Sequence, residues 1–348
     1  MGNLLQQVFS GENAPAETTQ LITILLVPEF SMMAFTSTVE PLRVVNRLSG
    51  REVYRVRIVS VDGEPVTASN GMTVLVNAAI DEVKNVSTIL VCASFNPEQY
   101  CNSRLLNWLR VHAERGSCLG GLDTGSYLLA EAGLLDGYRA TLHWESLAAF
   151  AETYPRVEVC EDLFHIDRSR ISCAGGTAAM DLMLELVETA LGRDMAQQVS
   201  DQLIHERIRK HQDAQKAGIS VRYNSHNPQL ESVIGEMQRH IEDPLTMCQL
   251  AAVVGISRRH LDRLFKNYLG ATPGEFYVNL RLDRARQLLE QTAMSITEIG
   301  LATGFSSSTC FSRSFRTRWQ CSPREHRKRK AQGASAPQVK SLLRAEAV

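Results

Sequence analysis

The sequence predicts an α/β domain built on a mostly parallel sheet with helices on both faces, followed by an all-α domain with two helix-turn-helix units. Three observations predict this order. Short apolar runs of strand length alternate with amphipathic segments over residues 21–216. One longer pattern then occurs twice within residues 229–330. Basic residues are concentrated at the carboxyl-terminal end of a chain that is acidic elsewhere.

These patterns divide the 348 residues into five parts. Residues 1–20 are polar and are expected to form a flexible tail, and residues 21–216 form the α/β domain. Residues 217–228 contain Gly, Ser, Asn and Pro, which predicts a linker. Residues 229–330 form the helical domain, and the Ala- and Ser-rich residues 331–348 are expected to be disordered.

The first predicted strand is a continuous apolar run over residues 21–27, which is typical of a strand buried on both faces of a parallel sheet. Alternation of apolar and polar residues predicts a second strand over 54–60. The remaining predicted strands cover residues 72–76, 88–92, 118–122, 139–142, 157–159 and 170–173.

Helical spacing of apolar residues separates these strands. The predicted helices of the α/β domain cover residues 32–48, 97–115, 126–132 and 177–191. The charged stretch 193–216 is expected to continue the domain as one more helix, with Leu203 and Ile204 packing inward.

The helical domain contains the same half-motif over residues 245–277 and again over residues 294–326. Gly255 corresponds to Gly304, and Phe265 corresponds to Phe315 one residue further along the second copy. In the first copy, Gly255 supplies the positive φ that a tight helix C-cap needs. Ser257 is a good N-cap for the helix that follows. Each copy therefore predicts a helix, a tight turn and a second helix.

The second helix of each unit carries polar and basic residues between its apolar positions, which suits a helix lying in a DNA major groove. In the first unit these residues are Arg258, Arg259, His260, Asp262 and Arg263. In the second unit they are Ser306, Ser307, Ser308, Thr309, Ser312, Arg313 and Arg316.

Several motifs occur in order through this domain: A-x-x-x-G-x-S-x-x-x-L-x-R-x-F, G-x-T-P, R-x-x-x-A-x-x-L-L, I-x-E-I-x-x-x-x-G-F, F-x-R-x-F and S-P-R-E. The domain resembles the DNA-binding domain of the AraC family. Gln320 stands where members usually have glycine after the second recognition helix. The resemblance implies base-reading roles for Arg259, Asp262 and Arg263 in the first unit, and for Ser308, Thr309 and Arg313 in the second.

Residues 120–145 and 172–192 resemble the PfpI/ThiJ-type fold, a flavodoxin-like member of the class I glutamine amidotransferase-like superfamily. The enzymes of that superfamily carry a cysteine at the elbow between a strand and a helix, and here the elbow residue is Asp123. Met33 stands about where the family has a glutamate, and Glu29 is out of register. The resemblance therefore implies a domain with no catalytic residue, and we expect that the protein is not an enzyme.

The two resemblances together match the GlxA-type AraC regulators, several of which respond to amino acids or quaternary amines. We expect a small-molecule effector at the carboxyl end of the sheet, where such folds bind ligands. The candidate ligand-binding residues are Asp123, Thr124, Tyr127, His143 and Trp144. Asp123 could pair with an ammonium group, and Tyr127 and Trp144 could offer aromatic faces to a cation.

Each candidate also has a structural explanation. Asp123 could cap the elbow helix, which is expected to stabilise its carboxylate as an anion. Trp144 could be part of the core, and His143 could be a hydrogen-bonded structural histidine. Thr177 is expected to cap the helix that follows Gly176 rather than to contact a ligand.

From Ser225 onward the chain has 18 Lys and Arg against 11 Asp and Glu, although its net charge is −1. A basic end on an acidic body indicates a DNA-binding module attached to a different kind of domain. The expected partners are double-stranded promoter DNA, the effector, RNA polymerase and a second copy in a homodimer. Eight cysteines without paired spacing, and no apolar run of membrane length, favour a cytoplasmic protein. No metal or cofactor is expected.

The predicted function is that of a transcriptional regulator, an activator, controlled by a small nitrogenous metabolite such as an amino acid or a betaine-like compound. Two alternatives remain open from the sequence. A redox-responsive regulator would use Cys118 or Cys173. A hydrolase or amidase fused to a DNA-binding domain would need a nucleophile other than the missing elbow cysteine.

Overall fold

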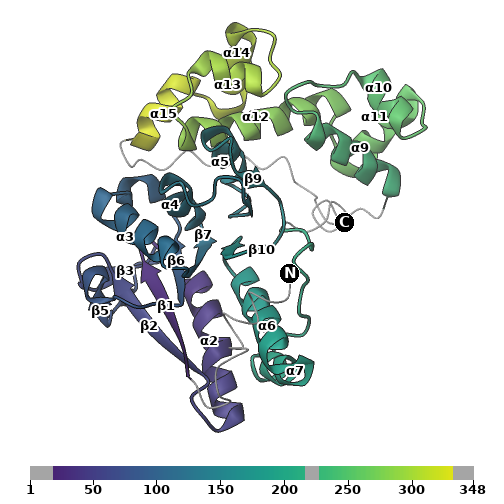
Figure 1. Cartoon of the computed structure of the whole chain (residues 1–348). Coiled ribbons are helices and arrows are strands. Elements are labelled where there is room, and N and C mark those ends of the chain that lie inside the picture. Colours follow the sequence, from purple (N-terminus) through teal and green to yellow (C-terminus); the bar gives the residue numbers. More distant parts are fainter. Residues whose placement is uncertain (1–18, 216–226, 332–348) are drawn as a thin grey trace. The chain divides into compact units, whose positions relative to one another are not determined.

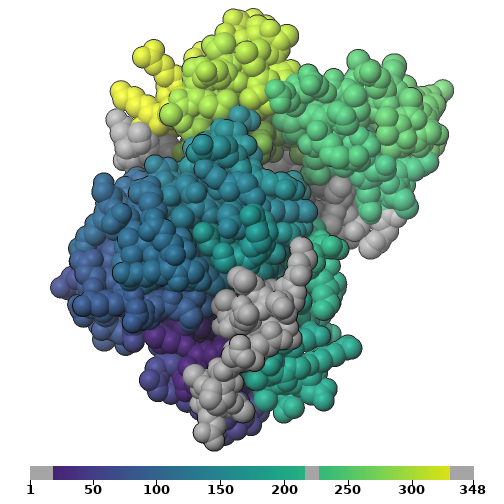
Figure 2. Space-filling model, in the orientation of Figure 1, coloured from purple at the N-terminus to yellow at the C-terminus, as the bar shows by residue number. Residues whose placement is uncertain are grey.

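The computed structural model describes residues 19–215 and 227–331, and each of these ranges forms a compact unit of its own (Figure 1). The two units are described separately. Figure 2 shows the same residues as space-filling atoms, from purple to teal in the first unit and from green to yellow in the second. Most of the predicted tails and linker lie outside the described residues. Within the two ranges, no helix combines the length and the apolar character that a membrane span requires.

The first unit contains a seven-stranded sheet in the order β10-β11-β7-β6-β1-β2-β5. Every neighbouring pair in it is parallel except β10 and β11, which are antiparallel. The strands are β1 (Gln20–Leu26), β2 (Tyr54–Ser60), β5 (Ala78–Ala79), β6 (Thr88–Ala93), β7 (Cys118–Asp123), β10 (Phe164–Asp167) and β11 (Arg170–Cys173).

Alternate residues of the central strands feed two separate cores, one on each face of the sheet. In β1, Ile22 and Ile24 belong to one core and Leu25 to the other. In β6, Leu90 belongs to the first core and Val91 to the second. Because both faces are covered, these strands can be apolar throughout, as their sequence predicts.

Helices cover both faces, which confirms the predicted fold class (Figure 1). The first core is closed by α2 (Met32–Ser49), α6 (Ala178–Leu191) and α7 (Arg193–Gln202). The second core is closed by α3 (Ser103–Glu114), α4 (Ser126–Glu131) and α5 (Leu147–Thr153). Short elements complete the unit: β3 (Val66–Thr67), β4 (Thr73–Val74), β8 (Arg139–Ala140), β9 (Glu158–Val159), η1 (Ile80–Glu82) and η2 (Pro97–Tyr100).

The single helix predicted over residues 97–115 is wrong, because the chain forms two elements there. A 3-10 turn, η2, is followed by the α-helix α3. The break occurs at Asn102, whose backbone is extended and whose side-chain oxygen accepts a hydrogen bond from the Leu105 amide at 3.0 Å. Asparagine is among the best N-cap residues, so a local cap overrides the continuous apolar spacing.

The helix predicted over residues 193–216 is also wrong, since α7 ends at Gln202. Leu203 packs against the first core, but Ile204 has a positive φ of 54° and is 92% exposed. Beyond it the chain is held by the fully buried Asp181 of α6. The Asp181 carboxylate accepts hydrogen bonds from His205 Nε2 at 2.9 Å and from the backbone amide and guanidinium of Arg209 at 2.6–2.9 Å. This ionic anchor replaces the expected helix.

Sequence periodicity does not predict β10, the antiparallel edge strand. It pairs with β11 across the tight turn at Arg168, which has a positive φ of 53°. The strands predicted over 139–142 and 157–159 are shortened to β8 and β9, which pair with each other outside the main sheet. Thr177 begins α6 without a side-chain cap, since its hydroxyl oxygen accepts a hydrogen bond from Arg209 instead.

The second unit consists of seven helices in the described range. They are α9 (Pro228–Arg239), α10 (Met247–Val253), α11 (Arg258–Leu269), α12 (Pro273–Gln291), α13 (Ile296–Ala302), α14 (Ser308–Trp319) and α15 (Pro323–Ala331). Four of them begin with a reciprocal capping box, in which a hydroxyl residue and an acid or amide three positions later satisfy each other's amides. The four pairs are Thr246–Gln249, Thr272–Glu275, Ser295–Glu298 and Ser322–Glu325.

The long helix α12 runs between two halves that repeat the same packing. In the first half, Leu261 and Phe265 of α11 are buried against Tyr277. In the second half, Phe311 and Phe315 of α14 are fully buried. The aromatic contact of Phe315 with Trp319, 4.5 Å between ring centroids, closes this second core.

Gln320 takes the left-handed backbone conformation that glycine takes at the equivalent end of α11. The φ angle is 54° at Gln320 and 65° at Gly270, and each amide hydrogen-bonds the carbonyl four residues earlier. The turn is therefore retained, although a residue with a Cβ is strained at this φ. The Gln320 side chain also donates to the Thr317 carbonyl at 3.0 Å.

We predict that Gly270→Ala lowers the free energy of unfolding by about 1 kcal/mol, because alanine is strained at positive φ. Gln320→Gly should raise it by up to about 1 kcal/mol. Urea denaturation of the full chain, followed by circular dichroism, measures both changes. Gly274→Ala is the control, because Gly274 is helical and has open space around its Cβ position. An equal loss at Gly274→Ala would contradict the backbone explanation.

Candidate DNA-binding surface and candidate ligand site

The first helix-turn-helix unit presents a basic face on α11. The turn contains Gly255 at φ 67°, and Ser257 caps α11 by accepting a hydrogen bond from the His260 amide at 3.2 Å. Leu261 and Phe265 then anchor one side of the helix in the core. The residues predicted to face DNA all lie on the exposed side: Arg258, Arg259, Asp262 and Arg263.

Two of the predicted base-reading side chains of α11, Asp262 and Arg263, contact neighbouring side chains on the same helix. Arg258 forms an i,i+4 ion pair with Asp262 at 3.2 Å, and both side chains are about half exposed. Arg263 contacts the His260 ring at 3.0 Å. Exposed pairs of this kind contribute little to stability, so DNA phosphates or base edges can replace them at small cost. Asp262 therefore also serves to orient Arg258.

The second helix-turn-helix unit repeats this arrangement on α14. Gly304 has φ 73°, and the Ser307 hydroxyl accepts from the Cys310 amide at 3.2 Å. The predicted contacts Ser308, Thr309 and Arg313 are exposed, as is Cys310 between them. This face has more hydroxyls and fewer charges than that of α11. The two recognition helices thus offer different chemistry to the two grooves they would enter.

Two arginines that the sequence does not single out hold the second helix-turn-helix unit against α12. Arg281 donates to the Thr303 carbonyl at 2.8 Å and stacks 4.2 Å from the Phe305 ring centroid. Arg318 donates to the Asn279 carbonyl at 2.6 Å and pairs with Asp283 at 2.7 Å. Both guanidinium groups bind other parts of the same domain, which a count of arginines in the sequence cannot reveal. They position α14 rather than face a groove.

In the amino-terminal unit, the strand β7 ends at a strained elbow. Asp123 has a positive φ of 60°, which is unusual for a residue other than glycine. A Cβ on Gly175 would lie 2.6 Å from the Asp123 Cβ, so only glycine fits opposite the elbow. Gly125 is the N-cap of α4, and no side-chain cap bond is made there. Asp123 is therefore not the N-cap of the elbow helix, although its carboxyl accepts a hydrogen bond from the Thr124 amide in the same turn.

The expectation that Asp123 is stabilised as an anion is also wrong. Burial raises the pKa of the Asp123 carboxyl to about 7. Hydrogen bonds from the Ser31 hydroxyl and the Thr124 amide lower the pKa, but they do not compensate for the lost hydration. The nearby acidic Glu145 raises the pKa further. Ser31, the N-cap of α2, was not predicted as part of this site, because nothing in its sequence context distinguishes it from an ordinary N-cap.

Two of the predicted ligand-binding residues are used inside the fold. The Thr124 hydroxyl is buried and donates to the Ser94 carbonyl at 2.6 Å. Tyr127 packs edge-on against Phe150 at 5.0 Å, and its hydroxyl donates to the Ser146 carbonyl at 3.5 Å. With Tyr127 only 7% exposed, its ring cannot present a face to a ligand as expected. The helix spacing placed it near Asp123 but could not show that its ring points into the core.

His143 and Trp144 lie half-buried in the loop before α5. Their ring centroids are 5.5 Å apart, and His143 Nδ1 lies 3.9 Å from the Glu145 carboxylate. Glu145 in turn acts on Asp123, which relates this loop to the elbow. A second acid, Glu29, follows β1 at φ 63° and accepts a hydrogen bond from Asn96 at 3.1 Å. The structure therefore connects Asp123 electrostatically with the predicted loop.

Family models match both units. The model of the DJ-1/PfpI family matches residues 21–189, and a model described as a helix-turn-helix domain matches residues 250–329. The transcriptional regulator CdhR of Pseudomonas aeruginosa is 50% identical over 303 residues, which are 87% of this chain and 90% of that protein. The chain belongs to the AraC family of regulators with a DJ-1/PfpI-type amino-terminal domain. It is thus a DNA-binding transcriptional regulator.

Other relatives of this AraC-type regulator agree over nearly their whole lengths. GbdR of Pseudomonas aeruginosa is 41% identical, over 88% of this chain and 84% of that protein. GlxA of Rhizobium meliloti is 34% identical, over 91% of this chain and 98% of that protein. A solved THiJ/PfpI family protein from Pseudomonas syringae is 19% identical at a TM-score of 0.50, covering 70% of this chain and 93% of that one. That last likeness concerns the fold alone.

We predict that the Asp123 carboxyl makes the regulator less stable as the pH rises. Its pKa is about 7 in the folded chain against 3.8 for an ordinary aspartate. The folded state then holds the proton more tightly, so its contribution is complete below about pH 4 and is lost as the pH passes 7. The full effect is on the order of 4 kcal/mol.

Urea denaturation between about pH 4 and pH 8 should show this decline in the wild type, and Asp123→Asn should remove it. Glu114→Gln serves as the control, because Glu114 is an exposed carboxylate at the end of α3. An unchanged pH dependence in Asp123→Asn would show that other groups cause the decline.

Proposed function

We propose that this regulator is an activator whose DJ-1/PfpI domain binds a small nitrogenous metabolite, such as an amino acid or a betaine-like compound, without catalysis. The observation that carries the proposal is the elbow at Asp123. A buried acid lies there at the carboxyl edge of a parallel sheet, and the charge of the exposed Glu145 raises its pKa further. Ligands of open α/β sheets bind at that edge.

A cationic group is the ligand chemistry that this elbow favours. Burying an uncompensated carboxylate is unfavourable, and a second acid nearby makes it more so. An ammonium or quaternary ammonium group would offset both the cost of burying the carboxylate and the repulsion from the second acid. The half-buried Trp144 ring, next to His143, could stack on such a group. Thr124 and Tyr127 would then support the elbow from inside the core rather than contact the ligand.

The enzyme and redox alternatives lack a reactive thiol at the elbow. Cys92 and Cys173 lie close to Asp123, and both are completely buried. Burial raises the pKa of the Cys173 thiol, and likewise that of Cys118, to about 12. Thiolate rather than thiol is the nucleophile and the oxidisable form, so these residues are poorly suited to catalysis or redox sensing at neutral pH.

On DNA, the recognition helices α11 and α14 would enter successive major grooves, with Arg259, Arg263 and Arg313 as the principal cationic contacts. A homodimer would then bind two half-sites, and contact with RNA polymerase would account for activation. The capped, exposed faces of α11 and α14 support this reading.

We predict that Arg263→Ala and Arg313→Ala each weaken operator binding by about 1–3 kcal/mol, the usual contribution of a bidentate arginine–guanine pair. Binding to bulk competitor DNA should weaken much less. Fluorescence anisotropy at fixed salt measures both affinities. Arg43→Ala, an exposed arginine of α2, is the control. If binding to operator and to competitor DNA weakens equally, the residue contacts only phosphates.

We also predict that amino acids or betaines raise the melting temperature of the full chain, because a ligand of the folded state stabilises it. Asp123→Ala should abolish the shift, whereas Glu114→Ala should retain it. If the only ligands that raise the melting temperature are neutral or anionic, the proposed cationic recognition is wrong.

A further inference from the structure

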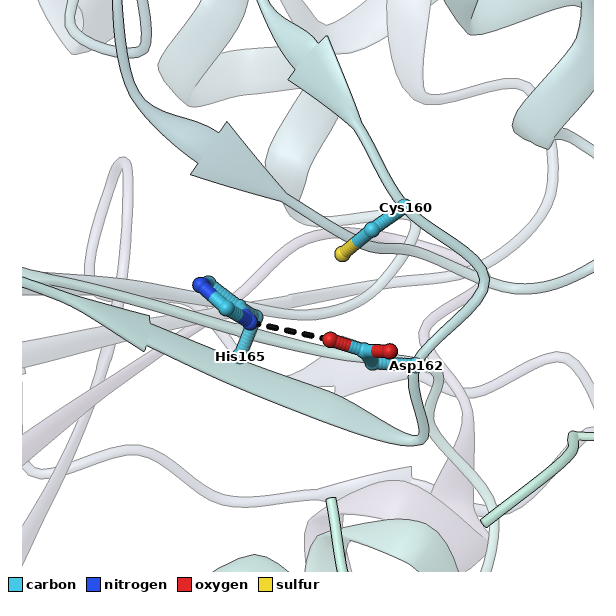
Figure 3. A group of neighbouring side chains, drawn as sticks. All are labelled: Cys160, Asp162 and His165. Carbon is cyan, nitrogen blue, oxygen red and sulfur yellow. Dashed lines mark hydrogen bonds and ion pairs between the residues drawn. The ribbon is translucent and has the colours of Figure 1, made fainter. Parts of the chain in front are cut away.

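Three potential metal ligands come together where the chain enters β10 (Figure 3). They are Cys160, Asp162 and His165, whose ligand atoms all lie within 4.8 Å of one another. His165 Nδ1 is 3.0 Å from the Asp162 carboxylate, and the Cys160 sulfur points toward the same space. Cys160 is buried and the other two side chains are about 15% exposed. The cluster is therefore partly shielded from water.

A fourth potential ligand comes from the segment after α7. His211 Nδ1 lies 4.0 Å from the same Asp162 oxygen and has no hydrogen-bond partner in the described part of the chain, although that atom is buried. The His211 carbonyl accepts a hydrogen bond from the Leu163 amide at 2.8 Å, which holds this residue beside the cluster. A buried polar atom without a partner is unfavourable and needs an explanation.

The donor set of one thiol, one carboxylate and two imidazoles is suited to Zn²⁺. Bonds of about 2.0–2.3 Å in a tetrahedron place ligand atoms roughly 3.5 Å apart, so the side chains, whose ligand atoms lie within 4.8 Å in the group of three, must rotate toward the ion on binding. Arg139 competes for the same anions, lying 4.0 Å from Asp162 and hydrogen-bonded to Cys160. Its side chain is 45% exposed and also lies 3.9 Å from Glu158, so it can turn away when a cation enters.

We propose that Cys160, Asp162, His165 and His211 form a Zn²⁺ site. Binding replaces the proton of the Cys160 thiol, which is released to solvent, and uses neutral imidazoles as ligands. The ion would join the strand β10 to the segment that leads out of the amino-terminal unit. Gln215 already hydrogen-bonds the Asp162 carbonyl at 2.8 Å, so metal would tighten an existing attachment. Zn²⁺ thereby controls how firmly residues 205–215 are held.

Cobalt titration of the metal-stripped full chain tests the site, because a Co²⁺–thiolate bond gives a charge-transfer absorption. We expect one Co²⁺ per chain and its displacement by Zn²⁺. Cys160→Ser should abolish the absorption, and Cys101→Ser, a half-buried thiol elsewhere, should leave it intact. His165→Gln and His211→Gln should each weaken binding by at least about 100-fold, since loss of even an indirect partner costs 10–100-fold.

Thermal unfolding of the metal-stripped full chain gives a second readout. Stoichiometric Zn²⁺ should raise the melting temperature of the wild type, because a ligand of the folded state stabilises it, and should not raise that of Cys160→Ser. The absence of a stoichiometric thiolate absorption, or an equal rise in melting temperature in Cys160→Ser, would overturn the proposal. Unchanged affinity in His211→Gln would overturn the attachment of the 205–215 segment through metal.

Discussion

The crowded carboxyl end of β7 is the constraint on which the amino-terminal unit depends. Asp123 turns there with a positive φ directly against Gly175, in a place that few water molecules can reach. The elbow is closely packed on two sides, because a Cβ on Gly125 would lie 2.0 Å from the Val91 carbonyl oxygen of β6 and one on Gly175 would lie 2.6 Å from the Asp123 Cβ. Burial raises the pKa of this carboxyl to about 7, so its charge is sensitive to the charges of neighbouring groups near neutral pH.

The DNA-binding unit depends on local structural features that occur in both of its helix-turn-helix units. A glycine with positive φ and a hydroxyl N-cap fix each turn, and the apolar side of the following helix then fixes which side remains exposed. Two half-buried arginines add contacts between distant residues, since Arg281 of α12 donates to the Thr303 carbonyl and Arg318 of α14 donates to the Asn279 carbonyl. Rigid placement of both recognition helices is what sequence-specific reading of two grooves requires.

The end of the amino-terminal unit is held mainly by polar groups. Residues 203–215 have little regular structure and are held by a few polar attachments, chiefly Arg209 to the buried Asp181 and Gln215 to Asp162. Segments with few apolar contacts open at low free energy, so a small change in these attachments changes how often the segment is released. The proposed metal cluster lies at one of them.

The sequence by itself determined the division into two domains, the order of the central strands and helices along the chain, and the exposed faces of both recognition helices. These follow from periodicity, capping residues and a repeated pattern, all of which act over a few neighbouring positions. Only the tertiary structure decided that burial raises the pKa of Asp123, that Tyr127 points inward, and that His211 approaches Asp162. Desolvation and contacts between distant segments depend on what surrounds a group in space, and residue spacing carries no record of those surroundings.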